Sequence, residues 1–497
     1  MKKKTLINFI ASFLYQISAL MVGLVLPKYY TEIFGSVYNG LNQSIAQVMG
    51  LLAILQYGIA ASSIQAMFKP IAEGDERNIA AIYRKTELQY RKMGYIFLLA
   101  ILPIIILYPF AIKDDITYWI VSIFVVLRGI SSAMEYFFQA KYNVILVANN
   151  RSYAIYFINT GLQFISVTLH LTVLFTLKNI IIYQSVAVIV TIIRLFVVSN
   201  YIKNKFPYLI HFSHEELTET KVDIKQRSDV MVSEIAGLVI SSTPLIVLST
   251  LSSLVYSSIY AVYNFVIAGM QGFLGSARES VIASMGKIYY SDKKNFNVNM
   301  DIFESIYFSI MLILYSTAIL VFTPFISVYT RKMDAEYDLP YLPVLFVLSA
   351  LIVGLRIPSI VAINIAGHFK QVKKYAIIEA AINITLSIVL TVRFNIYGVL
   401  ISTIVAGLYR TPVLIYYTYK NIYQRSLMSV IRKILVGSLI FIFTYLISRM
   451  IDYTPTSLLN WLILAGIAFL IMTFVVITML LLLNRTLLKY LLNLLKR

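Results

Sequence analysis

The chain has 497 residues, of which 59% are hydrophobic and 13% are charged, and its mean hydropathy is +0.79. Soluble domains carry about 25% charged residues, so a soluble protein of this composition could not cover its surface with polar groups. The sequence has no cysteine, which excludes disulfides and thiolate-bound metal sites. The net charge of +19 would otherwise suggest nucleic-acid binding. At this hydrophobicity it predicts a membrane protein without a nucleic-acid partner.

Apolar stretches long enough to cross a bilayer recur along the whole chain. A bilayer core about 30 Å thick needs roughly 20 apolar residues of helix. The sequence therefore predicts an all-α polytopic membrane protein with 14 transmembrane helices. The spans 40–64 and 257–284 are the most polar of them. The predicted spans are 6–28, 40–64, 93–112, 117–138, 153–176, 179–201, 231–254, 257–284, 302–330, 341–365, 374–392, 396–419, 432–450 and 458–484.

The positions of Lys and Arg predict the orientation of these helices. If the N-terminal Met-Lys-Lys-Lys is cytoplasmic and the spans alternate, 30 of the 42 basic residues fall in cytoplasmic segments and seven in external loops. The other five lie inside spans, away from the span ends. Cytoplasmic loops of membrane proteins are enriched in Lys and Arg. We therefore predict a multi-pass protein of the bacterial cell membrane with both termini in the cytoplasm.

A long polar segment divides the predicted helices into two sets. Residues 202–230 form the longest loop and lie near the middle of the chain. We predict an N-terminal lobe of helices 1–6 over residues 1–201 and a C-terminal lobe of helices 7–12 over residues 231–420. Residues 421–497 would form accessory helices 13 and 14 and a basic tail. No loop is large enough for a soluble catalytic domain, so we predict that the protein is not an enzyme.

Intramembrane arginines indicate that the two lobes are repeats. Arg128 in the fourth span matches Arg356 in the tenth, and Arg194 in the sixth matches Arg410 in the twelfth. Parallel repeats that hold a substrate between them are a common transporter design. The segment GIAASSIQAMFKPIAEGDERN also resembles GSARESVIASMGKIYYSDKKN at the corresponding place in the second set.

Arginine within a span is costly and needs a reason. One explanation is neutralisation by five acidic residues that also lie in spans. The other is a role in a substrate cavity, because a guanidinium binds phosphate through two parallel hydrogen bonds. We assign the cavity role to three arginines, Arg128, Arg278 and Arg356. For Arg194 and Arg410, pairing or snorkelling to the surface explains the charge equally well.

Polar residues on one face of the eighth span support a cavity. Their spacing of 0, 4, 11, 15 and 18 residues follows the helical repeat. Gln47 in the second span adds a further polar group. Interhelical hydrogen bonding is the alternative explanation for each of these groups. The stripe consists of Tyr260, Asn264, Gln271, Gly275 and Arg278.

The first 100 residues contain a basic N-terminus, the segment LPKYYTEIFGSVYNGLNQSI at 26–45, and the segment GIAASSIQAMFKPIAEGDERNIAAIYR at 58–84. In these features they resemble the polysaccharide-transporter family of O-antigen-type flippases for lipid-linked oligosaccharides, within the superfamily of multidrug and oligosaccharidyl-lipid exporters. It implies two six-helix lobes around a central cleft plus two C-terminal helices. Multidrug relatives commonly carry an acidic residue in the first helix for ion coupling, and this chain has none there. Glu234 and Glu379 are the remaining candidates for coupling to a cation gradient.

The resemblance and the arginines together predict a flippase that moves an undecaprenyl-pyrophosphate-linked oligosaccharide to the outer leaflet by alternating access, for surface polysaccharide (capsule or exopolysaccharide) synthesis. Its partners would be this polyprenyl-diphosphate-linked oligosaccharide, membrane lipids and a polysaccharide polymerase, with no cofactor. A lipid II flippase and a multidrug efflux antiporter are the alternatives. A membrane glycosyltransferase or polymerase is more remote, since its acidic site would have to be the charged turn at 331–340.

Overall fold

The computed structural model describes residues 2–56, 58–211, 228–450 and 455–483. Within these residues the chain is helical and forms no strand, as expected for an all-α membrane protein. It divides into two compact units, 1–258 and 259–497. The predicted basic tail and most of the predicted connecting loop lie outside the described residues.

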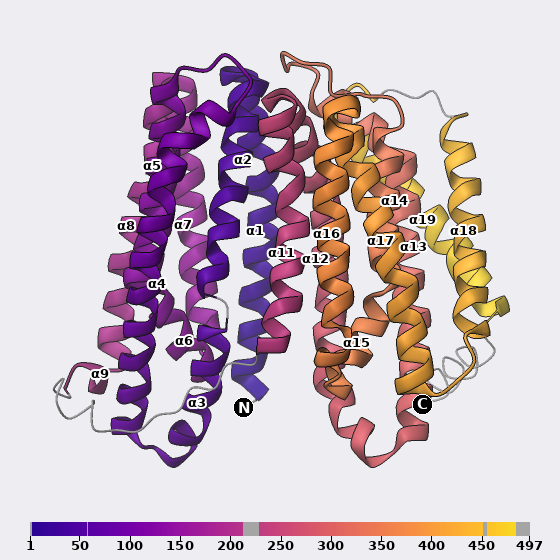
Figure 1. Cartoon of the computed structure of the whole chain (residues 1–497), viewed down its shortest axis with the longest axis horizontal. Helices are drawn as coiled ribbons and strands as arrows, with labels where there is room; N and C mark the ends of the chain where they lie inside the picture. Colours follow the sequence, from indigo (N-terminus) through magenta and orange to yellow (C-terminus); the bar gives the residue numbers. More distant parts are fainter. Residues whose placement is uncertain (1, 57, 212–227, 451–454, 484–497) are drawn as a thin grey trace. The chain divides into compact units, whose positions relative to one another are not determined.

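Unit 1 is a bundle of long helices (Figure 1). The N-terminal residues, the turn between α3 and α4, and the short helix α9 lie at one end of this bundle. The elements are α1 (Lys2–Phe34), α2 (Ser36–Leu52), η1 (Ala53–Gln56), α3 (Ile59–Glu73), α4 (Glu76–Ala111), α5 (Tyr118–Met134), η2 (Glu135–Gln139), α6 (Ala140–Ala148), α7 (Ser152–Thr172), η3 (Val173–Leu177), α8 (Ile180–Lys205), α9 (Tyr208–His211), α11 (Ser228–Leu251) and the first residues of α12 (Leu254–Ser291).

Unit 2 contains the rest of α12 and the helices that follow it. Its elements are α13 (Lys293–Tyr329), α14 (Leu342–Leu355), α15 (Ile357–Ala366), α16 (Phe369–Phe394), α17 (Ile396–Thr418), η4 (Tyr419–Tyr423), α18 (Met428–Ser448) and α19 (Leu458–Leu483).

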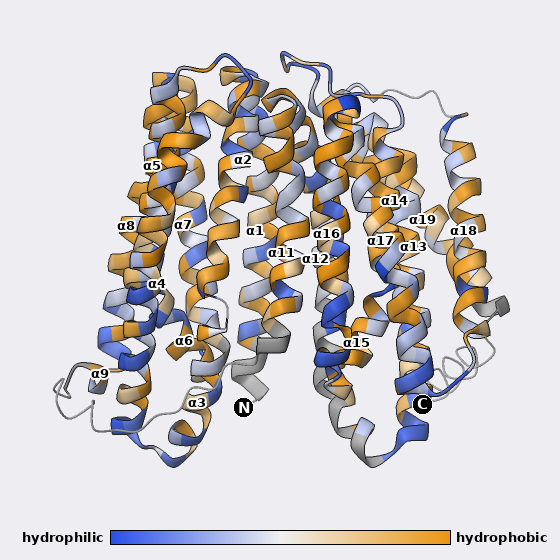
Figure 2. Cartoon of the chain, viewed as in Figure 1, coloured by the Kyte–Doolittle hydropathy of each residue, from blue (hydrophilic) through white to orange (hydrophobic). Residues whose placement is uncertain are grey.

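Twelve helical stretches among the described residues are long and apolar enough to span a membrane. Figure 2 shows hydrophobic residues along the middle of these helices and hydrophilic residues gathered near their ends. The predicted count of 14 is not confirmed. The two predicted spans that are missing, 40–64 and 257–284, are the most polar ones. The first is broken into α2, η1 and α3, and the second lies in α12.

Helices α4 and α13 begin in the same way, which supports the predicted repeat. Asp75 accepts a hydrogen bond from the backbone N–H of Asn78 at 3.0 Å, and Asp292 accepts one from Asn295 at 2.9 Å. Each side chain thereby satisfies a free N–H group of the first helical turn. The hydrogen bonds from Asn78 hold the pKa of the Asp75 carboxyl below its ordinary value. The two similar segments found in the sequence both end at these caps.

A buried glutamate follows each cap after twelve residues, Glu87 in α4 and Glu304 in α13. Glu87 forms ion pairs with Arg84, Arg91 and Lys141. Each unit therefore holds a carboxylate at the same helical position. A buried carboxylate needs such cations because its transfer from water is otherwise unfavourable.

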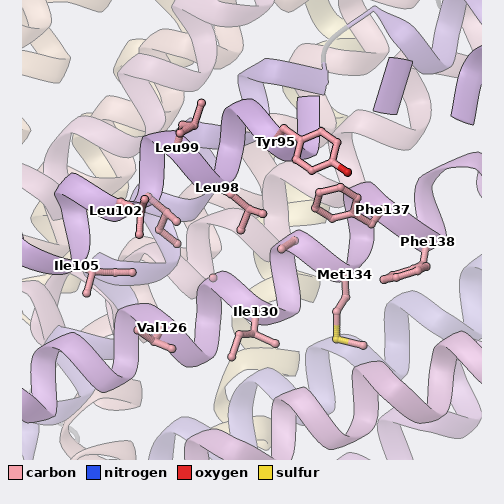
Figure 3. Close-up of a pocket in the computed structure, with 13 residues that line it drawn as sticks. Tyr95, Leu98, Leu99, Leu102, Ile105, Val126, Ile130, Met134, Phe137 and Phe138 are labelled. Carbon is pink, nitrogen blue, oxygen red and sulfur yellow. The ribbon is translucent and has the colours of Figure 1, made fainter. Parts of the chain in front are cut away.

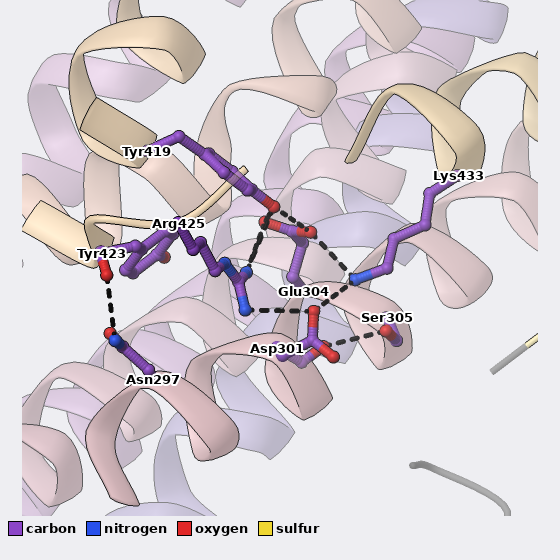
Figure 4. A network of polar contacts seen from close by, with 8 residues as sticks. All are labelled: Asn297, Asp301, Glu304, Ser305, Tyr419, Tyr423, Arg425 and Lys433. Atoms are coloured by element: carbon purple, nitrogen blue, oxygen red, sulfur yellow. Dashed lines mark hydrogen bonds and ion pairs between the residues drawn. The ribbon is translucent and has the colours of Figure 1, made fainter. Parts of the chain in front are cut away.

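Glu304 belongs to a network that connects η4 and α18 to α13 (Figure 4). Lys433 on α18 lies 2.9 Å from both Glu304 and Asp301, and the Tyr419 hydroxyl donates to Glu304 at 2.8 Å. Arg425 pairs with Asp301 at 3.3 Å. Because these groups come from α13, η4, α18 and the turn before it, the network holds these elements together at their polar ends.

The turn between α11 and α12 is held by polar groups of unit 1. The Asp114 carboxylate accepts hydrogen bonds from the Ser253 hydroxyl at 2.9 Å and from the Leu254 N–H at 2.7 Å. Lys113 donates to the Leu251 carbonyl oxygen at 2.7 Å. Both helix ends at this turn thus have free backbone groups satisfied. These contacts explain why α11 packs within unit 1, mainly against α2.

Gly40 permits the close approach of α2 to this turn. A Cβ atom at residue 40 would lie 1.8 Å from the Leu254 carbonyl oxygen, which is backbone and cannot rotate away. We expect Gly40→Ala to lower the stability of the protein by about 1–3 kcal/mol through overpacking. Gly50→Ala on the same helix is the matched control, since a Cβ there meets nothing within 4 Å. Thermal unfolding of the purified variants tests this, and equal midpoints for the two would contradict it.

Candidate functional site

A cavity of about 200 Å³ lies inside unit 2 and contains two of the predicted site residues. Gln271 and Arg278 reach it from α12, seven residues and thus about two turns apart. Tyr307 and Tyr315 face it from α13. Apolar residues and two glycines complete its lining. The full set is Gln271, Leu274, Gly275, Arg278, Tyr307, Tyr315, Ala350, Val353, Gly354 and Ile357.

Small residues keep this cavity open. A Cβ added at Gly275 would meet no atom within 4 Å, so the helix backbone there borders free space. At Gly354 an added Cβ would lie 2.4 Å from the Met311 sulfur, because α14 packs closely on α13. The closely packed helices α13 and α14 thus form one wall of the cavity.

Arg278 is the charged group of the cavity. Its side chain is partly exposed, while its Nε is buried and has no hydrogen-bond partner. Among the side chains that the structure describes, no carboxylate forms an ion pair with it. Tyr307 lies close enough to interact electrostatically with the Arg278 guanidinium. The Gln271 side chain forms a hydrogen bond with the Tyr315 side chain. The cavity therefore presents a guanidinium, an amide and two phenols, which are groups that bind anions and sugar hydroxyls.

The other two members of the stripe on α12 lie elsewhere in unit 2. Tyr260 is buried, with its ring 5.0 Å from that of Phe346, and Asn264 is half-buried. Three of the five stripe members, Gln271, Gly275 and Arg278, line the 200 Å³ cavity. The Tyr260 ring therefore packs against an aromatic side chain of the neighbouring helix α14.

Arg356 and Glu379 form an ion pair with each other. Arg356 lies between α14 and α15 and is 7% exposed; Glu379 on α16 is 1% exposed. Arg410 on α17 contacts the second carboxylate oxygen at 2.7 Å. Two arginines therefore share one buried carboxylate. Neutralisation by an intramembrane carboxylate, the alternative explanation for arginines within spans, therefore describes the contacts of Arg356 and Arg410.

The remaining predicted residues lie in unit 1. Gln47 on α2 accepts a hydrogen bond from Ser242 on α11 at 3.1 Å, and Glu234 on α11 is exposed. Arg128 on α5 donates to Asn42 at 2.7 Å. Arg194 on α8 is partly exposed. None of these residues is among those that line the cavity within unit 2.

Tyr307 and Tyr315 were not among the site residues predicted from the sequence. They stand eight residues apart, which places them near one face of α13 at helical spacing. This spacing could have identified the two tyrosines in the sequence, but it is a weak indication in a chain with 37 tyrosines.

A second cavity, of about 740 Å³, lies in unit 1 between α4 and the α5–η2 segment (Figure 3). Its lining is apolar apart from one tyrosine hydroxyl, and several of its side chains are strongly exposed, for example Leu99 at 69%. Apolar side chains exposed on a membrane-spanning helix face lipid. The apolar lining of this cavity can therefore contact hydrocarbon chains, but it contains no group that would pair with a charged lipid headgroup.

The acidic turn at 331–340 offers no metal site. Among the described residues, no three His, Asp or Glu side chains are grouped closely enough to hold a metal ion. Burial, with a smaller contribution from the Glu336 carboxylate, raises the pKa of the Asp338 carboxyl above its ordinary value.

No protein-family model matches the chain, and no curated protein matches it. Among solved structures, it is similar to lipid II flippase MurJ in an inward closed conformation, with a TM-score of 0.63 and 16% identity over 94% of this chain and 98% of that one. It is also similar to an inward-facing multidrug resistance MATE family transporter of the MOP superfamily, with a TM-score of 0.58 and 13% identity over 87% and 94%.

A third similar structure is that of the MATE multidrug transporter DinF-BH, with a TM-score of 0.57 and 13% identity over 86% of this chain and 96% of that one. At such identities the likeness establishes a common fold. The chain therefore has the fold that is shared by MurJ and the MATE transporters.

Proposed function

We propose that the protein is a flippase that carries an undecaprenyl-pyrophosphate-linked oligosaccharide from the inner to the outer leaflet of the bacterial cell membrane. The observation that carries this proposal is Arg278, a guanidinium without a carboxylate partner among the described side chains, at the wall of the 200 Å³ cavity in unit 2. The MurJ-like fold supports it, because that protein is named for moving a lipid-linked substrate.

The cavity fits one part of such a substrate. Its volume of about 200 Å³ is below the roughly 300–1,000 Å³ of a small-molecule pocket, so a whole oligosaccharide does not enter it. A phosphate group does. We infer that Arg278 binds the diphosphate and that Gln271, Tyr307 and Tyr315 bind adjacent hydroxyls, while the polyprenyl tail stays in lipid. Asn264, Tyr260, Gln47 and Arg356 remain candidates for further sugar contacts.

Transport requires no covalent chemistry in this scheme. The substrate site becomes accessible from one leaflet and then from the other, as in other alternating-access carriers. Glu234 is the better-placed candidate for cation coupling, because it is exposed, whereas Glu379 already neutralises two arginines. Both termini would face the cytoplasm, and a polysaccharide polymerase would consume the product outside.

Transport by the purified protein tests the proposal. The full chain is reconstituted into liposomes that contain a labelled undecaprenyl-diphosphate oligosaccharide in the inner leaflet, and its exposure outside is followed with a sugar-modifying enzyme. We expect exposure to rise well above that of protein-free liposomes. Transport of lipid II instead would favour the first alternative, which the MurJ fold also supports. Transport of a cationic dye alone would overturn the proposal in favour of drug efflux.

A further inference from the structure

A second arginine, Arg128, lies inside unit 1 without an anionic partner among the described residues. Its Nη2 donates to the Asn42 amide oxygen at 2.7 Å, and its Nε is buried with no acceptor. A guanidinium has five N–H donors, so one amide oxygen leaves most of them unused. No described carboxylate lies within 4.0 Å of it.

The groups around Arg128 are neutral hydrogen-bonding side chains and one imidazole. Gln184 on α8 donates to the same Asn42 oxygen at 3.2 Å and to the Tyr30 hydroxyl at 3.4 Å. The hydroxyls of Tyr30 and Tyr183 lie close enough to interact with the guanidinium. The cluster is thus formed by α1, α2, α5 and α8 and carries a positive charge. His170 adds no negative charge: its ring packs against Tyr183 at 4.4 Å, and its Nδ1 contacts the Ser166 carbonyl oxygen at 2.7 Å.

Unit 2 neutralises its buried arginines with its own carboxylate. There, Arg356 and Arg410 are both paired with Glu379 on α16. Glu379 lies eleven residues after His368, the N-cap of α16, and in the corresponding helix α7 the eleventh residue after the N-cap Arg151 is Leu162. Unit 1 therefore lacks the carboxylate that its counterpart has. Arg128 is partly exposed, but its Nε is buried, and a guanidinium whose N–H groups are shielded from water is disfavoured without an anion.

We propose that the Arg128 cluster binds a small exchangeable inorganic anion, of the size of chloride, that takes the place of the missing carboxylate. Arg128 would supply the charge, and the Tyr183 hydroxyl would donate a hydrogen bond to the anion, whereas the Tyr30 hydroxyl already donates to the Tyr38 carbonyl oxygen at 3.5 Å. Tyr30 is 1% exposed and Gln184 3%, so the walls of the site are closely packed and suit a small ion. This inference is independent of the proposed substrate, because it concerns neutralisation of a charge within unit 1.

Thermal unfolding of the full-length protein in detergent tests the site. The chain is purified in gluconate, and the midpoint is followed while sodium chloride replaces sodium gluconate at constant ionic strength. We expect a saturable rise in the midpoint, since a ligand that binds only the folded state stabilises it. Arg128→Gln should abolish the rise. Arg410→Gln is the matched control and should retain it, because Glu379 then still pairs with Arg356.

Direct binding keeps the test decisive if Arg128→Gln does not fold. Arg128→Lys retains the charge and should still bind radioactive chloride, with weaker affinity than the wild type. Absence of a chloride response in the wild type would overturn the proposal, and so would a response that Arg128→Gln leaves intact. A response to inorganic pyrophosphate and none to chloride would also overturn it, because Arg128 would then belong to a site for the lipid diphosphate.

Discussion

Replacement of Glu379 by Ala is expected to destabilise the protein by about 3–5 kcal/mol, since it leaves two buried arginines without their common anion. The Arg356 and Arg410 guanidiniums would then also repel each other, in the same buried environment. Thermal unfolding and the yield of folded protein from membranes measure the loss.

A combined variant separates the charge effect from lost packing. Replacing Glu379 by Gln together with Arg356→Met and Arg410→Met removes all three charges and keeps the side-chain volumes similar. Such apolar replacement of a buried ion triad is often neutral or stabilising. The combined variant should therefore be more stable than Glu379→Ala. If it is equally unstable, packing around α16 rather than charge is what Glu379 provides.

Replacement of Arg278 by Ala is expected to abolish transport in the liposome assay without lowering the amount of protein in the membrane. Arg278 has no described carboxylate partner, so its removal leaves no buried charge unpaired. The Arg278→Ala variant should therefore lose transport and keep its stability, whereas the Glu379→Ala variant should lose both. Arg278→Lys should transport at a reduced rate, because an ammonium does not reproduce the two parallel hydrogen bonds to phosphate.

Phe273→Ala provides the control on the same helix. Phe273 is 63% exposed and does not line the cavity, so its truncation should leave transport close to that of the wild type. Normal transport by Arg278→Ala would remove the observation on which the proposed function rests. Loss of transport in both variants would indicate a general effect on α12 instead.

The surroundings of each predicted site residue are formed by side chains that are distant from it in the sequence. Gln271 was predicted from helical spacing, because a polar stripe repeats at the period of a helix, and Arg278 from that spacing and from its charge within a span. The same spacing also selected Tyr260, which the structure buries against Phe346. Spacing identifies a shared helix face, and the neighbouring helix decides whether that face borders a cavity or another side chain.

Hydropathy by itself determined the membrane class and the all-α fold, because a chain in lipid must satisfy its backbone hydrogen bonds within each helix. It also located twelve helices that the structure confirms as long and apolar enough to span. Only the tertiary structure decided which arginines are neutralised. Glu379 lies 23 residues from Arg356 and 31 from Arg410, and no local pattern links them. Ion pairs between helices depend on how each helix is rotated and packed against its neighbours. The spacing of residues along a single helix carries no information about this rotation and packing.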